Sequence, residues 1–140
     1  MTGRGAVSVL EGFYDSYRSR NWSELAERTS PGAVWRQAAS LPWAGEWKGA
    51  DGFAAMMARI ADCATLTVTG NRSSALGADG VLVEVEATFT ARSSGRSLNT
   101  KVLELYRLRD GLVDGADAFY LDTHALQELL ADRADGAGPR

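Results

Sequence analysis

The sequence predicts a single α+β domain in which helices cover one face of an antiparallel sheet. In the first half of the chain, apolar residues recur at the three- to four-residue spacing of amphipathic helices. The second half contains four segments rich in Val, Leu, Thr and aromatic residues, separated by short connections typical of hairpins. A chain of 140 residues has the length of one domain with one core. Helices segregated to one face of an antiparallel sheet form an α+β domain, and strong curvature of the sheet would enclose a pocket.

The ordered domain is expected to cover residues 6–131. Residues 1–5 and 132–140 have no periodic apolar pattern, so we expect flexible tails at both ends.

Two helices are expected at the start of the domain. The first covers about Ala6–Ser19, where apolar residues return every three to four positions. Its apolar stripe contains Ala6, Leu10, Phe13 and Tyr17. The motif that follows, from Asn21 to Glu24, resembles a capping box, in which both side chains satisfy free backbone N–H groups. A short second helix should therefore run to about Arg28.

A turn at Ser30–Gly32 and a short strand at Ala33–Gln37 are expected next. The segment Leu41–Gly49 (LPWAGEWKG) then has two tryptophans, a proline and two glycines in nine residues. Proline and glycine indicate a loop, whereas tryptophan is costly to expose to water. The segment either packs as a plug or lines a cavity, and we expect Trp43 and Trp47 to line or cover the mouth of the pocket.

The remaining elements follow from composition and periodicity. A third helix is expected at Asp51–Cys63, with a buried stripe that includes Phe53 and Met56. Asp122 can cap a last helix at Thr123–Leu130. The four expected strands are Thr65–Ala75, Val81–Ala91, Ser97–Arg109 and Leu112–Tyr120.

Composition argues against several functional classes. The net charge is −3 and the basic residues are scattered, so no nucleic-acid surface is expected. The apolar runs are much shorter than the roughly 20 residues of a membrane span, and the N-terminal residues have no apolar segment typical of a secretory signal, so we expect none. One cysteine, Cys63, and one histidine, His124, provide neither an internal disulfide nor a histidine cluster for a metal. We therefore expect a cytoplasmic protein without metal or cofactor, and no partnership with nucleic acid or membrane.

Three segments together resemble the NTF2-like superfamily, and within it the SnoaL-like (polyketide cyclase-like) and ketosteroid isomerase-like group. They are Arg20–Leu25 (RNWSEL), Leu41–Phe53 (LPWAGEWKGADGF) and the closing strands Tyr106–Asp122. The resemblance covers about residues 6–130. It implies a cone in which a curved antiparallel sheet wraps around three to four helices and encloses an apolar pocket. This fold hosts isomerases, cyclases, epoxide hydrolases, dehydratases and non-catalytic domains, so the activity must be argued from the site.

The resemblance to ketosteroid isomerases implies positions for three catalytic groups. The helix-1 tyrosine falls on Phe13, with Tyr14 and Tyr17 close by, and the catalytic base falls on Arg36. The protonated acid falls on Glu104, the one chemically matched position. Because a cation replaces the base, ketosteroid isomerisation itself is not expected. An Arg36–Glu104 pair could instead orient a carbonyl group, while the carboxylate moves the proton.

The sequence leaves open whether Glu104 points into the cone and which late-strand aspartate does so. Alternation places Glu104 on one strand face with Val102 and Tyr106, and this face could point into the cone or outward. SnoaL-type cyclases imply an acid/base aspartate on a late strand, which would be Asp114 or Asp117. Asp114 is the first choice, because the resemblance places its strand face toward the cavity.

The leading hypothesis is a small cofactor-independent enzyme that acts by acid/base proton transfer on a hydrophobic carbonyl compound of polyketide or terpenoid type. The reaction would be a cyclisation, an isomerisation or a dehydration. The alternatives are an epoxide hydrolase or epoxide-opening cyclase, and a non-catalytic module for ligand binding or dimerisation. The resemblance also implies a homodimer, for which Val81, Val83, Val85 and Phe89 could supply a sheet face. The residues expected to bind substrate are Phe13, Tyr17, Trp35, Trp43, Trp47, Met56, Tyr106 and Tyr120.

Overall fold

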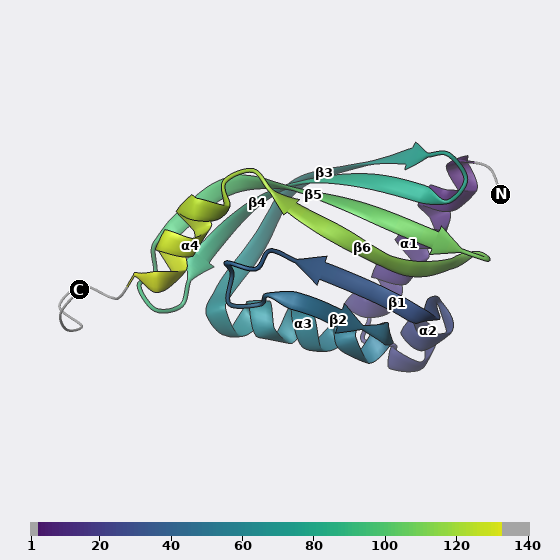
Figure 1. The fold of residues 1–140 in the computed structure, drawn as a ribbon, viewed down its shortest axis with the longest axis horizontal. Coiled ribbons are helices and arrows are strands. Elements are labelled where there is room, and N and C mark those ends of the chain that lie inside the picture. Colours follow the sequence, from purple (N-terminus) through teal and green to yellow (C-terminus); the bar gives the residue numbers. More distant parts are fainter. Residues whose placement is uncertain (1–2, 133–140) are drawn as a thin grey trace.

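The computed structural model describes residues 3–132, which form a curved six-stranded sheet with four helices (Figure 1). The predicted α+β class is confirmed. The elements are α1 (Gly3–Arg18), α2 (Trp22–Glu27), β1 (Thr29–Gln37), β2 (Gly45–Lys48), α3 (Gly49–Cys63), β3 (Ala64–Leu76), β4 (Gly80–Ala91), β5 (Ser97–Arg109), β6 (Leu112–Tyr120) and α4 (Thr123–Ala131). Residues 1–2 and 133–140 of the predicted tails lie outside the described part.

The sheet is mixed rather than wholly antiparallel. Its strand order is β2-β1-β6-β5-β4-β3, and β1 runs parallel to β6 while the other neighbours are antiparallel. The four late strands agree with their predicted bounds to within one residue. The parallel pair joins the first strand to the last, and no local pattern in the sequence reports such a pairing. Figure 1 shows α1 and α3 on the concave side of the sheet, so the core lies between them and the strands.

The helix boundaries follow from local capping. α1 begins at Gly3, three residues before the predicted start. At the start of α2, the Asn21 side chain accepts a hydrogen bond of 3.2 Å from the backbone N–H of Glu24, as the motif predicts. The Glu24 carboxylate accepts from the side-chain amide of Asn21 at 3.0 Å, whereas the Asn21 backbone N–H donates to the carbonyl of Ser16. The carboxylate also accepts hydrogen bonds from the Ser16 hydroxyl (3.0 Å) and the Arg28 guanidinium (2.9 Å), which ties α2 to α1.

The predicted turn at Ser30–Gly32 lies inside β1, which starts at Thr29. The register of β1 against β6 is irregular between Thr29 and Val34. Because proline cannot donate a ladder hydrogen bond, such an irregular stretch is where a strand tolerates Pro31.

The Trp-rich segment contains β2, a strand that the sequence does not predict. β2 pairs with β1, and Trp47 lies opposite Trp35. Trp43 is fully buried in the core, stacks on Phe89 at 6.1 Å and donates its indole N–H to the Tyr120 hydroxyl at 2.9 Å. Trp47 is half-buried and donates to the backbone carbonyl of Trp43 at 3.2 Å. Trp43 is therefore a plug, and the expected lid over the pocket is not formed.

Replacing Trp43 with phenylalanine is expected to lower the free energy of unfolding by about 2–3 kcal/mol, because it removes a buried hydrogen bond and leaves a void. Urea unfolding followed by circular dichroism measures this loss. Trp22, whose exposed fraction is 47%, provides the matched control, and Trp22→Phe should change the stability by less than about 0.5 kcal/mol. Equal losses in the two variants would contradict the burial of Trp43.

A β-bulge in β6 changes which residues face the core. Tyr106 pairs with Ala116 and Leu108 pairs with Val113, so two residues of β6, Asp114 and Gly115, lie opposite one residue of β5. The bulge reverses the alternation along β6. Val113 is consequently fully buried, and the neighbouring Asp114 side chain turns outward.

Candidate functional site

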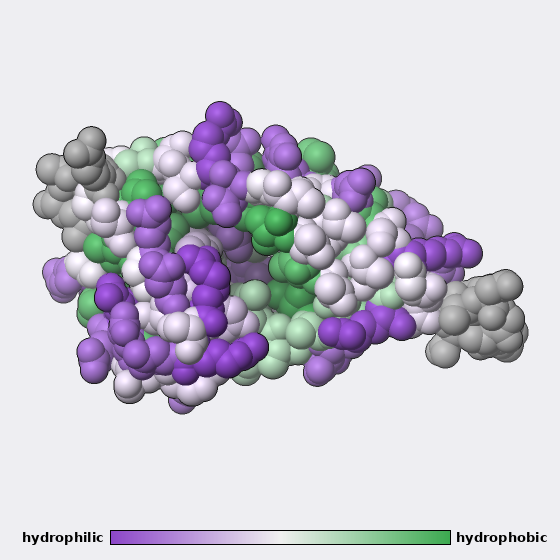
Figure 2. Space-filling view, turned by 180° about the vertical axis from the view of Figure 1, so that it is seen from behind, coloured by the Kyte–Doolittle hydropathy of each residue, from purple (hydrophilic) through white to green (hydrophobic). Residues whose placement is uncertain are grey.

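A cavity of about 660 Å³ lies between α1, α3 and the concave face of the sheet. Figure 2 shows it as a hollow in the face opposite that of Figure 1, with hydrophobic atoms along one side and hydrophilic residues on the other. Its wall is mostly aliphatic, aromatic and thioether. The main apolar contributors are Phe53, Met56, Met57 and Ile60 from α3, Val83, Val85, Ala87 and Phe89 from β4, and Val102 from β5. A large apolar cavity with few polar groups is typical of a small-molecule site.

Three hydrogen-bonded polar residues of the cavity form a group that we call the tyrosine–glutamate cluster: Tyr14, Glu104 and Tyr106. The hydroxyl of Tyr14 lies 2.7 Å from the Tyr106 hydroxyl and 3.2 Å from Oε1 of Glu104. α1 contributes Tyr14, and β5 places Glu104 and Tyr106 two residues apart on its inner face. The structure thus settles the direction of Glu104, which points into the cone.

Burial changes the acidity of all three groups. Desolvation raises the pKa of Glu104 to about 7, although the hydrogen bond from Tyr14 acts in the opposite direction. Desolvation, followed by the charge of Glu104, raises the pKa of Tyr14 and of Tyr106 well above the ordinary value for tyrosine. Glu104 can therefore exist in either protonation state near neutral pH, while both tyrosines keep their protons. A carboxyl group of this kind can accept or return a proton, and the hydroxyl groups can donate hydrogen bonds.

The raised pKa of Glu104 predicts a pH-dependent stability. The folded protein binds the proton more tightly than the unfolded chain, so this contribution is complete below the ordinary pKa of 4.5 and is lost as the pH rises through about 7. The difference between these values corresponds to about 3 kcal/mol of unfolding free energy. Urea unfolding at about pH 5 and about pH 8.5 should show this loss in the wild type but not in Glu104→Gln. Parallel pH profiles for the two proteins would contradict the assignment.

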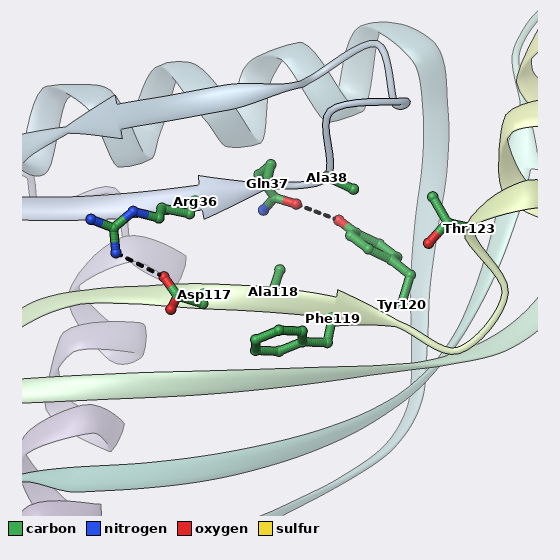
Figure 3. Close-up of a pocket in the computed structure, with 8 residues that line it drawn as sticks. All are labelled: Arg36, Gln37, Ala38, Asp117, Ala118, Phe119, Tyr120 and Thr123. Atoms are coloured by element: carbon green, nitrogen blue, oxygen red, sulfur yellow. Dashed lines mark hydrogen bonds and ion pairs between the residues drawn. The ribbon is translucent and has the colours of Figure 1, made fainter.

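A second hydrogen-bonded group closes the other end of the cavity. The Tyr120 hydroxyl accepts from Trp43 and donates to Oε1 of Gln37 at 2.7 Å, and Nε2 of Gln37 lies 3.3 Å from the sulfur of Met56. Figure 3 shows the Gln37–Tyr120 bond at an outer pocket of about 450 Å³. Gln37 and Tyr120 line both spaces, so they form the wall between them.

Arg36 lies in this outer pocket and not beside Glu104. Its guanidinium donates to Glu46 at 3.1 Å and to Asp117 at 3.4 Å, the latter bond visible in Figure 3. Side chains alternate along a strand, and Trp35 faces the core, so Arg36 faces outward. The predicted Arg36–Glu104 pair is therefore not formed. Asp117 also pairs with Arg107, which places this carboxylate on the outer face.

Asp114 does not line the cavity either. Its carboxylate accepts a hydrogen bond from the Ser30 hydroxyl and lies 3.7 Å from the Arg109 guanidinium. The preference for Asp114 assumed unbroken alternation along β6, and the bulge at Gly115 breaks it. The inward face of β6 beyond the bulge is made by Ala116, Ala118 and Tyr120.

Half of the predicted substrate-binding residues line the cavity, namely Tyr17, Met56, Tyr106 and Tyr120. Phe13, Trp35 and Trp43 belong to the solid core, and Trp47 packs beside it. Phe13 holds Trp35, Phe53 and Tyr106 in ring contact, so it supports the wall without reaching the cavity.

The sheet face proposed for a homodimer is inside the molecule. Val81, Val83 and Phe89 are buried, and Val83, Val85 and Phe89 line the cavity. The polar residues that alternate with them, including Glu84 and Glu86, lie on the outer face, which is typical of a half-exposed strand.

The prediction from sequence missed Tyr14 and the charged residues of the cavity. Tyr14 follows Leu10 by four residues and precedes Tyr17 by three, so its helical position next to Phe13 was the available signal. Glu11, Arg18 and Arg92 also line the cavity. The Arg18 guanidinium pairs with Asp15 at 2.6 Å and lies 6.0 Å from the centre of the Tyr14 ring.

Within residues 3–132, no group of three or more His, Cys, Asp or Glu side chains could hold a metal ion. None of the helices among these residues is long and apolar enough to cross a membrane.

Comparison with protein families places this geometry in a known context. The model of the SnoaL-like domain family matches residues 10–115. No curated protein matches the sequence.

Several solved structures share the fold. An NTF2-like protein from Burkholderia xenovorans LB400 has a TM-score of 0.83 at 20% identity, covering 93% of this chain and 98% of that chain. TerC co-crystallised with polyporic acid has a TM-score of 0.67 at 18% identity, with 91% and 99% covered. A Xanthomonas campestris pv. campestris protein named "putative polyketide cyclase" has a TM-score of 0.68 at 15% identity, with 91% and 96% covered. Identities this low establish the fold and leave the activity to be argued from the site.

Proposed function

This chain belongs to the SnoaL-like domain family, and we propose that it is a cofactor-independent enzyme that transfers a proton on an apolar carbonyl compound. The observation that carries the proposal is the tyrosine–glutamate cluster, in which a carboxyl group with a pKa of about 7 is hydrogen-bonded by a tyrosine inside an apolar cavity. A general acid or base works best when its pKa is near the working pH.

In the proposed reaction, the Glu104 carboxylate removes a proton from the carbon next to the substrate carbonyl. The electrons of the C–H bond move into the carbonyl group and form an enolate oxygen. As Glu104 becomes protonated, it becomes a weaker acceptor, and the Tyr14 hydroxyl is free to donate to the enolate oxygen. The Tyr106 hydroxyl, whose oxygen is 2.7 Å from that of Tyr14, is hydrogen-bonded to it and helps to hold it in position. Glu104 then returns the proton, either to another carbon in an isomerisation or to the new alkoxide after an aldol-type ring closure.

We infer the substrate class from the size and the lining of the cavity. A volume of about 660 Å³ and an apolar wall suit a medium-sized hydrophobic molecule with one buried oxygen, such as a polyketide- or terpenoid-like ketone. The two neighbours named "putative polyketide cyclase" and the neighbour co-crystallised with polyporic acid support this class. Epoxide opening has less support, because it needs an acid and a base on either side of the substrate and Glu104 is the one carboxyl group in the cluster.

A hydrogen–deuterium exchange screen tests the proposal without knowledge of the natural substrate. The protein is incubated in D₂O with a panel of apolar ketones and 1,3-diketones, and loss of the hydrogens next to the carbonyl is followed by NMR. We expect saturable exchange above the buffer rate for at least one ketone that binds. Saturable binding without exchange across the whole panel would contradict the enzyme and support a non-catalytic binding module.

A further inference from the structure

Trp35 carries a buried polar group that the proposed mechanism does not use. Its exposed fraction is 2%, and its indole N–H is buried without a hydrogen-bond partner of normal geometry among the described residues. A buried N–H without a partner is costly, so such a group needs an explanation. Trp35 does not line the cavity, which means that a ligand there does not reach it directly.

The sheet places Trp35 beside Tyr106. Ala116 of β6 pairs with Trp35 on one side and with Tyr106 on the other, so the three residues form one row across neighbouring strands. Figure 1 shows β6 between β1 and β5. All three are buried on the inner face. Ala116 puts only a methyl group between the two side chains, and Phe13 contacts both rings from α1. The indole N–H is near enough to the Tyr106 hydroxyl to lower the pKa of that group, against the larger effect of its burial.

Trp35 matters because the tyrosine hydroxyls have few hydrogens to donate. Each tyrosine hydroxyl carries a single hydrogen, and the hydroxyl of Tyr14 faces two acceptors, Tyr106 and Glu104. Tyr14 can donate to only one of them at a time. Indole N–H is a donor only, so Trp35 can interact with Tyr106 only by donating to its oxygen. A hydroxyl that accepts a hydrogen bond becomes a better donor, which favours donation from Tyr106 to Tyr14.

We infer that Trp35 is a positioning residue whose indole N–H, acting through the hydroxyl of Tyr106, sets the direction of the hydrogen-bond chain so that it ends on Glu104. The order of donation is Trp35 to Tyr106, Tyr106 to Tyr14, and Tyr14 to Glu104. Trp35 thereby keeps the Tyr14 hydrogen on the carboxylate in the resting site. The inference rests on the proposed function for its role in catalysis, but its test needs no substrate, so the two can fail separately.

The test must exclude effects of the other polar and charged groups near Glu104 on its pKa. The groups that face Glu104 are Tyr14 from α1, Tyr106 from its own strand and Tyr120 from β6, whose pKa is raised chiefly by burial and also by the charge of Glu104. The charged residues elsewhere in the cavity wall are Glu11, Arg18 and Arg92. Trp35→Phe leaves all of these in place and removes only the N–H and part of the ring.

The test is the pKa of Glu104, measured by NMR titration of the ¹³C-labelled glutamate carboxyl groups. In Trp35→Phe the Tyr14 hydrogen can turn to Tyr106, the carboxylate loses a donor, and the pKa of Glu104 should rise by roughly one unit. Trp47→Phe is the matched control, because Trp47 lies opposite Trp35 on β2 and donates to a backbone carbonyl. It should leave the pKa of Glu104 unchanged.

A double-mutant cycle separates this role from packing. When Tyr106→Phe removes the intermediate hydroxyl, Tyr14 retains Glu104 as its acceptor, and adding Trp35→Phe should no longer shift the pKa of Glu104. An unchanged pKa in Trp35→Phe, or the same shift with and without the Tyr106 hydroxyl, would overturn the inference. If Trp35→Phe does not fold, a measurement on the wild-type protein tests the inference instead. Its Trp35 indole proton signal should titrate with the midpoint of Glu104, and a signal that stays constant across that midpoint would overturn the inference.

Discussion

Glu104→Gln is expected to lower the rate of proton transfer by roughly 10²–10⁴-fold, while the affinity for an apolar ketone changes only a few-fold. Glutamine has nearly the shape of protonated glutamate, so the cavity wall and the hydroxyl of Tyr14 keep their places. It can neither accept the substrate proton nor return it. The exchange rate of a ketone found in the D₂O screen measures the loss, and ligand titration measures the affinity.

Asp114→Asn is the matched control for this substitution. It also neutralises a carboxylate, but Asp114 is bonded to Ser30 outside the cavity. Its proton-transfer rate should stay within a few-fold of the wild type. A Glu104→Gln protein with the full rate, or an equal loss in Asp114→Asn, would refute the assignment of Glu104 as the proton carrier.

Gly115→Ala is expected to lower the free energy of unfolding by more than about 4 kcal/mol, enough to unfold a domain of ordinary stability. Gly115 has φ +109°, a conformation that side chains rarely adopt, and a Cβ atom there would lie 2.6 Å from the carbonyl carbon of Val34. The clash is with the backbone of the parallel partner β1, so no side-chain rotation relieves it. Denaturant unfolding measures the loss, and circular dichroism shows whether the variant folds.

Gly45→Ala separates the two causes. Gly45 has nearly the same φ, +106°, but no atom lies within 4 Å of the place its Cβ would take. This variant should lose only about 1–2 kcal/mol, the cost of the backbone conformation alone. Equal losses at the two glycines would show that the close approach of β6 to β1 does not limit the fold.

Local patterns in the sequence were sufficient for most of the secondary structure. Strands β3–β6 alternate apolar and polar residues and are bounded by turns, so their ends could be predicted to within one residue. The cap at Asn21 follows from two side chains three residues apart. The inward position of Glu104 also agrees with the resemblance, which assigned the acid to that residue.

Long-range geometry explains what the sequence could not show. The parallel pairing of β1 with β6 and the bulge at Gly115 depend on contacts between distant segments, and the bulge moves Asp114 out of the cavity. Alternation around Trp35 would have shown that Arg36 points outward once the inner face of β1 was known. The plugging role of Trp43 depends on its distant partners Phe89 and Tyr120.

The pKa of Glu104 in the ligand-free protein tests the account most directly. It can be measured by ¹³C NMR titration, with Glu104→Gln used to assign the signal. The buried cluster predicts a midpoint of about 7. A midpoint near the ordinary value of 4.5 would mean that Glu104 is well solvated and permanently ionised at neutral pH, and it would contradict the proposed proton transfer.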